Sequence, residues 1–334
     1  MVGYVLRRIA FIVPTLIGVS LIAFFLVHWM PGDPAEILAG EHASPEVIEQ
    51  FRKDLRLDRP LPEQYLLYVG GLVRGDLGRS AKTHEPVSAE IRRYFPATVE
   101  LALTALFIAT LLGTAMGALA ARRPGGWADA ASTSAAALGV SMPVFWLGLL
   151  LMYLLAVRFP VLPVSGRSPA LLEIEVRTGF LLLDTVWTGN REGFVAALRH
   201  LALPAVVLAT VPLAVIARIT RSSLLEAMGR DYIRTARAKG VAEAVVLLRH
   251  AARNSILPTL TVIGLQFGFL LGGAIITETI FAWPGIGRWI VLAVEARDPR
   301  VLQAGVLLMA VSFTLVNLVT DVAYAALDPR IKLR

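Results

Sequence analysis

The stretch GRDYIRTARAKGVAEAVVLLRHAARNSILP, residues 229–258, is a basic, helix-forming segment between two long apolar blocks. It holds six Lys/Arg residues against two acidic ones, whereas the residues on either side are almost entirely apolar. A charged segment between two hydrocarbon-like blocks is typical of a loop at a membrane surface. The stretch therefore indicates a membrane-spanning chain rather than a soluble domain.

Composition agrees with that interpretation. Of 334 residues, 56% are hydrophobic and 17% are charged, whereas a soluble domain carries about 25% charged residues. The chain has no cysteine, which excludes disulfides, thiolate metal sites and cysteine nucleophiles.

Six apolar blocks are each long enough to cross about 30 Å of hydrocarbon at about 1.5 Å per residue. The first is longer than the apolar run of a signal peptide, so we expect it to remain as a helix. The fold class expected is all-α and polytopic. The predicted spans are residues 9–28, 98–121, 132–157, 200–219, 257–279 and 301–327.

The distribution of Lys and Arg predicts the orientation of these spans. One side carries the N-terminus, loops 122–131 and 220–256, and tail 328–334. With Arg218 at its edge, that side holds 15 of the 32 Lys/Arg residues but five of the 25 acidic ones. The positive-inside rule places this side, with both termini, in the cytoplasm. A membrane-surface origin explains the basic charge without nucleic acid.

Two loops are expected outside, residues 29–97 and 158–199. In the first, Ser44 is a plausible N-cap with Pro45 at the first helical position, and PEQYLLYVGGL reads as a second short helix. We expect a small helical extracytoplasmic cap; the alternative is ordinary connecting loop.

The opening stretch itself predicts a helical elbow. Apolar spacing favours one helix over 222–239 and a second over 241–256, with Gly240 at the turn because glycine accepts left-handed backbone. Pro258 then opens the fifth span. Such an elbow seats in a groove on a soluble partner; the alternative is an amphipathic helix lying on anionic lipid.

YIRTARAKG…LRHAARNSILP resembles the EAA-type cytoplasmic loop of ABC-transporter integral membrane subunits, specifically the importer permeases of the peptide/nickel type. The segments LRRIAFIVPTLIGVSLIAFFLVHWMPGDP, FPATVELAL, SMPVFWLG, ETIFAWPGIGRW and DPRIK resemble the family in the same order. Length and the sizeable second outer loop look most like the B-type subunits of dipeptide permeases.

The resemblance implies the ABC type I importer permease fold in a bacterial inner membrane. It implies four kinds of contact: a homologous second permease, two nucleotide-binding ATPase subunits, a periplasmic substrate-binding protein and the lipid. ATP and Mg²⁺ would bind to the ATPase subunits. This chain itself would bind no cofactor. The motif's leading Glu is replaced by Arg234, and Arg230 stands where an acid is frequent. The implied coupling-loop residues are Tyr232, Arg234, Thr235, Ala236, Arg237, Lys239, Gly240 and Val241.

The fifth block carries glycines at every fourth position, namely Gly264, Gly268 and Gly272. Such a ridge permits close helix approach in a membrane. With Thr261 and Gln266, these residues are predicted to line the pore or an interface with a second permease. The alternative is packing within the same subunit.

Motifs for other functions are absent from the sequence. No G-x-x-x-x-G-K-[ST] or H-E-x-x-H occurs, so neither a P-loop nor a common zinc site is present, and we expect no catalytic residues.

Glu100 and Glu278 fall near the outer span edges, and Asp321 and Arg218 near the inner edges. A midplane relay expected of an ion-coupled transporter is missing. That class and an intramembrane enzyme remain the alternatives, and cargo stays open among dipeptides, oligopeptides, glutathione and nickel.

Overall fold

A computed structural model describes residues 2–29, 35–36, 43–54, 57–169 and 172–327, so the predicted tail 328–334 lies outside the described residues. Within them the regular secondary structure is helical apart from one isolated bridge, which confirms the all-α class. The helices are α1 (Val2–Trp29), α3 (Pro45–Asp54), α4 (Leu61–Val73), α5 (Val87–Arg122), α6 (Trp127–Ser141), α7 (Val144–Met152), α8 (Leu181–Trp187), α9 (Arg191–Met228), α10 (Asp231–Ala238), α11 (Glu243–Val245), α12 (Ala252–Ile280), α13 (Ile286–Glu295) and α14 (Pro299–Leu327).

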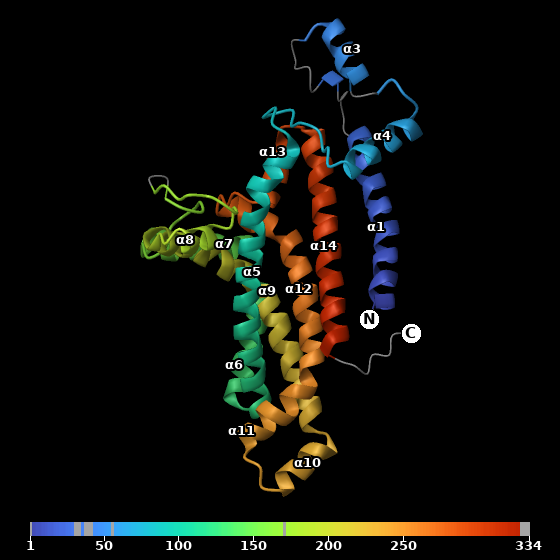
Figure 1. Cartoon of the computed structure of the whole chain (residues 1–334). Coiled ribbons are helices and arrows are strands. Elements are labelled where there is room, and N and C mark those ends of the chain that lie inside the picture. Colours follow the sequence, from blue (N-terminus) through green and yellow to red (C-terminus); the bar gives the residue numbers. More distant parts are fainter. Residues whose placement is uncertain (1, 30–34, 37–42, 55–56, 170–171, 328–334) are drawn as a thin grey trace.

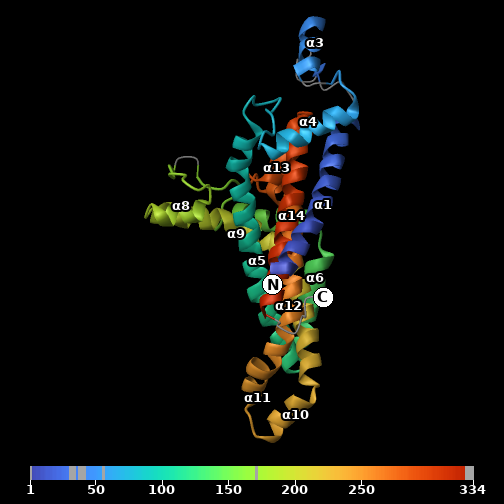
Figure 2. The ribbon, with the colours of Figure 1, turned by 45° about the vertical axis from the view of Figure 1, so that its right-hand side comes forward.

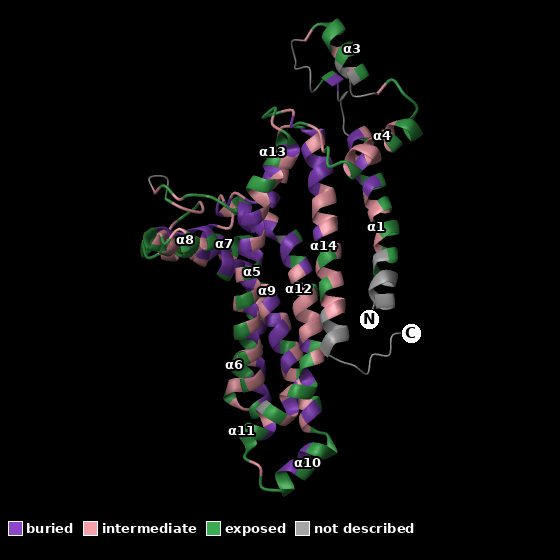
Figure 3. Cartoon of the chain, viewed as in Figure 1, coloured by how far each residue is buried: buried purple, intermediate pink, exposed green. Residues whose placement is uncertain are grey.

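Five of the described helices are long and apolar enough to cross a membrane, or six if α6 and α7 form one bent span. The elements α5, α9 and α12 form the central bundle, α14 packs on α12, and α1 packs on α14 (Figure 1). The buried residues gather where these helices face one another (Figure 3). The polytopic architecture is therefore confirmed.

Small residues let α5 and α9 approach closely. A Cβ at Gly117 would lie 2.6 Å from the carbonyl oxygen of Ala217, and one at Gly113 would lie 2.9 Å from that of Leu213. Alanines such as Ala105 and Ala109 are fully buried on the same face. In lipid, the hydrophobic effect does not drive helices together. Close backbone approach stabilises the pair instead, because it allows extensive van der Waals contact.

The third predicted span, 132–157, is wrong as a continuous helix. The chain bends by 100° between α6 and α7, and a π-helical turn, Tyr153–Arg158, follows α7. Met142 is extended, with ψ of 126°, as the residue before a proline prefers. Pro143 then precedes the first residue of α7. The apolar run continues through the Ser-Met-Pro sequence, but the helix does not.

Other boundaries differ from the predictions. The fourth span starts at Arg191 instead of residue 200, because the Asn190 side chain caps α9 by accepting a 2.8 Å hydrogen bond from the Gly193 amide. The second begins at Val87 and the fifth at Ala252, so Pro258 lies inside α12 instead of opening it.

Both predicted helices of the first outer loop are present. The Ser44 hydroxyl accepts a hydrogen bond from the Val47 amide at 3.4 Å, and Pro45 is the first residue of α3. The element α4 lies across the end of the molecule that carries α3, beside α1 and the start of α14 (Figure 2). The elbow, residues 229–251, lies at the opposite end (Figure 1).

Candidate functional site

The elbow begins where α9 ends. Gly229 and Arg230 interrupt the helix expected over 222–239, because α9 ends at Met228 and α10 starts at Asp231. Beyond Gly240, the short α11 and a π-helical turn, Val246–Ala251, lead directly into α12. The elbow therefore joins two long helices of the bundle with very little irregular chain.

Gly240 has a φ of 75°, as its place in the sequence predicted. Its amide donates to the Arg237 carbonyl at 2.9 Å, and the Val241 amide donates to the Ala236 carbonyl at 3.3 Å. These are the two hydrogen bonds of a Schellman turn, which requires left-handed backbone at its glycine. Nothing lies within 4 Å of a Cβ built at Gly240, so the constraint is the backbone conformation and not space.

Below the turn, α10 is anchored by an apolar patch, here called the elbow cluster. Ile233 is fully buried and Ala236 is 8% exposed, and both point toward the ends of α5, α9 and the π-helical turn. These contacts pack α10 against the ends of the spanning helices. The elbow cluster consists of Ala121, Leu224, Ala227, Ile233, Ala236, Val246 and Ala251.

Charged pairs add to this anchoring. Arg237 donates to both carboxylate oxygens of Glu243, at 3.1 and 2.6 Å, across the turn. This hydrogen bonding raises the pKa of Arg237 above its ordinary value. At the base of the elbow, Arg221 of α9 donates to both oxygens of Asp129 of α6, at 2.6 and 2.7 Å. The Arg237–Glu243 pair joins the two sides of the elbow, and the Arg221–Asp129 pair joins α9 to α6 at the base of the elbow.

The predicted coupling-loop residues divide into two sets. Ala236 faces the elbow cluster, and Val241 is half-buried beside it. The others are exposed, so they form the outer surface of the elbow: Tyr232, Arg234, Thr235, Arg237, Lys239 and Gly240. Arg230, the residue that departs from the family pattern, pairs with Glu226 at 2.5 Å.

A polar groove opens beside this surface. It has a volume of about 370 Å³ and lies between the end of α9, the start of α10 and the start of α12. Residues from all three elements meet there although Glu226 and Pro258 are far apart in sequence. The groove is lined by Ser223, Glu226, Ala227, Arg230, Tyr232, Asn254, Ser255 and Pro258.

The glycines of α12 fall into two groups. A Cβ at Gly264 would lie 2.2 Å from the Thr320 side chain, and one at Gly268 would lie 2.8 Å from Phe313, so both pack α12 on α14. Gly272 is exposed, with nothing within 4 Å. The buried side-chain amide oxygen of Gln266 has no hydrogen-bond partner in the described structure. The Thr261 hydroxyl donates to the Leu257 carbonyl at 2.9 Å.

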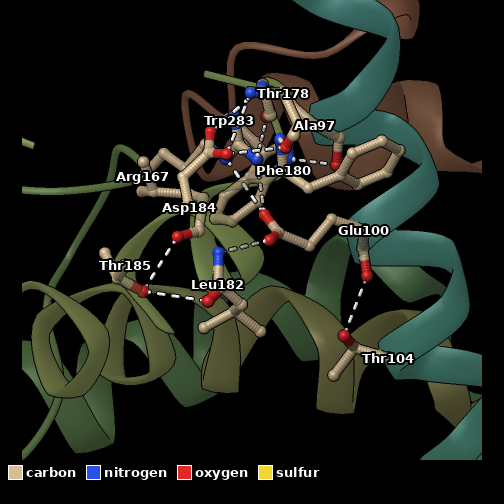
Figure 4. Close-up of polar contacts among 12 residues, drawn as sticks. Ala97, Glu100, Thr104, Arg167, Thr178, Phe180, Leu182, Asp184, Thr185 and Trp283 are labelled. Atoms are coloured by element: carbon tan, nitrogen blue, oxygen red, sulfur yellow. Dashed lines mark hydrogen bonds and ion pairs between the residues drawn. The ribbon is translucent and has the colours of Figure 1, made fainter. Parts of the chain in front are cut away.

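A buried polar cluster lies around Glu100 of α5, and no local pattern in the sequence predicted it (Figure 4). Arg167 donates to Glu100 through two nitrogens, at 3.1 and 2.5 Å, and the Leu182 amide donates to the same carboxylate at 2.8 Å. The Arg167 guanidinium lies 5.8 Å from the centre of the Trp283 ring. The cluster fastens the chain segment between α7 and α9 to α5.

Asp184 of α8 supports the same loop (Figure 4). Burial opposes its ionisation, but the Thr178 hydroxyl donates to it at 2.7 Å and backbone amides of Arg177, Thr178 and Gly179 add further hydrogen bonds. Together these donors hold the pKa of Asp184 below its ordinary value. The loop is thus held by a carboxylate that stays charged at neutral pH.

Glu278, near the end of α12, is another buried carboxylate. It is fully buried, accepts from the Thr98 hydroxyl at 2.6 Å and accepts from the Arg288 amide at 3.0 Å. A Cβ at Gly285 would lie 2.2 Å from a Glu278 oxygen. The carboxylate therefore closes the start of α13 against α12 and α5, in the segment ETIFAWPGIGRW.

Two family models cover almost the whole chain. Residues 113–333 match the model described as "Binding-protein-dependent transport system inner membrane component", and residues 1–102 match its N-terminal counterpart.

Individual relatives cover the chain from end to end. It is 48% identical over 336 residues to the dipeptide transport system permease protein DppB of Escherichia coli strain K12, with 99% of each chain covered. It is 47% identical to the di/tripeptide transport system permease protein DppB of Pseudomonas aeruginosa and 41% identical to the glutathione transport system permease protein GsiC of Escherichia coli O6:H1, again over 99% of each chain.

Among solved structures, the inward-facing MetNI methionine ABC transporter shares the fold. The TM-score is 0.52 at 16% sequence identity, with 70% of this chain and 93% of that chain covered. At this identity the likeness concerns the arrangement of helices alone. Together with the two family models and the full-length relatives, it leads to one conclusion: the chain is a multi-pass inner-membrane permease and belongs to the family of ABC importer membrane components of binding-protein-dependent transport systems.

Proposed function

We propose that this permease forms the pore of an ATP-driven importer that carries di- or oligopeptides delivered by a periplasmic binding protein. The observation that carries the proposal is the 48% identity, over 99% of both chains, to a permease of a dipeptide transport system. The chain pairs with a homologous second permease and with two ATPase subunits, which bind ATP and Mg²⁺. It contributes no catalytic residue of its own.

The elbow is the contact with the ATPase in this proposal. Its outer surface presents Tyr232, Arg234 and Lys239, and the adjacent groove of about 370 Å³ offers both charged and neutral polar groups. A folded helix seated in a groove is a common docking mode. Because the elbow cluster fixes α10 to α5 and α9, closure of the ATPase subunits is transmitted to the pore helices.

The elbow and both termini lie in the cytoplasm, and α3 and α4 lie in the periplasm. Support comes from the excess of Lys and Arg at the elbow end. Because the chain has no native cysteine, single-cysteine variants labelled by an impermeant maleimide in intact cells test this orientation without background.

For the translocation path, we propose the face of α12 that carries Gly272; Gln266 lies about 120° away around the helix. Gly272 is open and the Gln266 oxygen lacks a partner within the described subunit. A second permease or the cargo would supply the hydrogen-bond donor for Gln266 and the contact surface for Gly272 that the subunit alone does not. Gly264 and Gly268 are occupied by contacts with α14, so they position this face but do not line it.

The test is uptake of a labelled dipeptide by cells whose own peptide permeases are deleted. We expect uptake with the complete importer and none when the partner ATPase carries a substitution of its catalytic carboxylate. Uptake that persists without ATP hydrolysis would instead support an ion-coupled secondary transporter.

Glutathione is a competing candidate for the cargo, since the chain is also 41% identical to a glutathione transport permease. Nickel is the other cargo that the family resemblance leaves open. The ligand retained by the binding protein that co-purifies with the importer distinguishes peptide from glutathione and from nickel.

A further inference from the structure

A cavity of about 450 Å³ lies at the end of the molecule opposite the elbow. Its lining residues come from the end of α1, from α4 with the turn that follows it, and from the first turns of α14. Figure 2 shows these helices at that end of the molecule. Its volume is within the range of about 300–1,000 Å³ typical of small-molecule sites. The cavity is remote from the elbow and from the α12 face described above.

Three polar groups line this cavity without a hydrogen-bond partner among the described residues. They are the Arg300 guanidinium, the Gln303 amide and the Tyr68 hydroxyl. Gln303 is 6% exposed, and the Tyr68 oxygen is buried. Burying polar groups without partners costs free energy, and native proteins pair nearly all of them. Among the described residues nothing accepts a hydrogen bond from these three groups, and of the three the Tyr68 oxygen is the one that is fully buried.

The neighbouring acids are already engaged. The Asp298 carboxylate accepts from the Ser80 hydroxyl at 2.7 Å, from the Ala81 amide at 2.7 Å and from the Val301 amide at 3.2 Å. Asp76 accepts from the Gly78 amide at 2.9 Å. Neither acid forms an ion pair with Arg300 within the described structure, although both lie close enough to favour its charge.

The backbone of the loop at Gly78 leaves room for the Arg300 side chain. Gly78 has a φ of 80°, and a Cβ there would lie 3.2 Å from the Arg300 Cδ. A side chain at position 78 would press on the stem of the arginine. The loop therefore leaves room for the Arg300 side chain, whose guanidinium lines the cavity.

The charge of the lining favours an anionic group. The lining residues include two arginines, Arg74 and Arg300, and one acid, Asp76, while His28 is hydrogen-bonded to Gln64 at 3.2 Å. Arginine and a neighbouring hydroxyl are a common combination for phosphate, since the guanidinium presents several donors in one plane.

The surroundings favour a lipid as the source of that phosphate. Apolar side chains stand exposed on α4 around the cavity, with Leu66 69% and Val73 83% exposed. Trp29, at the end of α1, is 76% exposed. Tryptophan at the end of an apolar span marks the level of the lipid headgroups, and exposed leucine and valine beside it suit acyl chains.

We propose that this cavity binds the phosphate headgroup of a membrane phospholipid through Arg300, Tyr68 and Gln303. The bound lipid joins α1 and α4 to α14 and so fastens the N-terminal helix to the bundle. The site is separate from cargo and from the ATPase.

The experiment uses the assembled importer, stripped of lipid in detergent. Its thermal unfolding is followed while short-chain phosphatidylethanolamine, phosphatidylglycerol or inorganic phosphate is added. We expect saturable stabilisation by the phospholipids and none by inorganic phosphate at equal concentration. Arg300→Gln should raise the half-saturating lipid concentration by about tenfold or more, whereas Arg297→Gln, at an exposed position outside the cavity, should leave it unchanged.

Tyr68→Phe separates ligand binding from folding. Without lipid, loss of an unpartnered buried hydroxyl should leave the unfolding temperature unchanged or higher. With lipid, the same change should weaken binding by roughly fivefold. Equal lipid stabilisation of wild type, Arg300→Gln and Tyr68→Phe would overturn the proposal, as would equal stabilisation by inorganic phosphate or no stabilisation at all, which would mean that water fills the cavity.

Discussion

Arg237 and Glu243 lie on opposite sides of the left-handed residue Gly240, and their side chains meet in two hydrogen bonds of 3.1 and 2.6 Å. The pair closes the tip of the elbow at the point where α10 gives way to the helix that enters the bundle. The tip is thereby a folded unit that presents a fixed surface rather than a loose linker.

The first prediction concerns the turn itself. Gly240→Val places a β-branched residue at a φ of 75°, where left-handed backbone costs about 1–2 kcal/mol for a residue other than glycine. We expect co-purification of the ATPase subunits to fall by roughly 5- to 30-fold if that whole cost opposes docking. Gly229→Val is the matched control, because Gly229 has an ordinary φ of −80° and a Cβ there meets nothing closer than 3.5 Å. Normal assembly and transport by Gly240→Val would contradict the elbow as the docking element.

The second prediction concerns force transmission through the elbow cluster. Ile233 is fully buried beneath α10, and Ile→Ala in a packed core costs about 2–5 kcal/mol. We expect Ile233→Ala to increase hydrogen exchange in 231–240 and to lower transport per ATP hydrolysed. Ile256→Ala makes the same chemical change at a side chain that is 53% exposed, and it should alter neither measurement. Unchanged exchange in Ile233→Ala would show that the cluster does not hold α10.

The third prediction concerns the segment that the sequence marks as ETIFAWPGIGRW. Gly285→Ala would bring a methyl group to 2.2 Å from the buried Glu278 carboxylate, which is held by hydrogen bonds from the Thr98 hydroxyl and the Arg288 amide. We expect a drop of several degrees in unfolding temperature, measured by size-exclusion chromatography after heating detergent-solubilised protein. Gly18→Ala has nothing within 4 Å and serves as the control. Equal stability of the two variants would contradict the role given to Glu278.

The fourth prediction concerns Arg167 and Glu100, whose side chains are 12% and 7% exposed. Arg167→Met leaves a buried carboxylate without its cation, which costs about 3–5 kcal/mol. The double variant Arg167→Met/Glu100→Gln removes that charge and should recover much of the loss. We expect the double variant to unfold at a higher temperature than Arg167→Met. The opposite order would mean that the pair does not act through charge.

The sequence predicted the fold class and the turn at Gly240, because long apolar runs and an isolated glycine in a helical pattern are local signals. It missed the 100° bend between α6 and α7, although Pro143 stood in the run, because the hydropathy on both sides stayed high. Glu100 and Arg167 are 67 residues apart in the chain, so no spacing rule joins them. The same holds for Asp129 and Arg221, which come together only once α6 and α9 pack.

The pore assignment stays a prediction for a related reason. A ridge of glycines has the same sequence whether it meets the same subunit or another one. Gly264 and Gly268 meet side chains of α14, and this could be found only with α14 in place. The open surface at Gly272 is a feature that the sequence pattern alone did not separate from the other two.

The most direct test of the elbow as the ATPase-docking surface is a cross-link from a single cysteine at its tip. Arg234, whose side chain is 77% exposed, is changed to cysteine in a chain with no other cysteine. Glu85→Cys, at a position at the opposite end where the native side chain is 42% exposed, is the control. We expect Arg234→Cys to cross-link to the ATPase subunit and Glu85→Cys to form no such cross-link. Labelling of Arg234→Cys by an impermeant maleimide from the periplasm, with no ATPase cross-link, would contradict it.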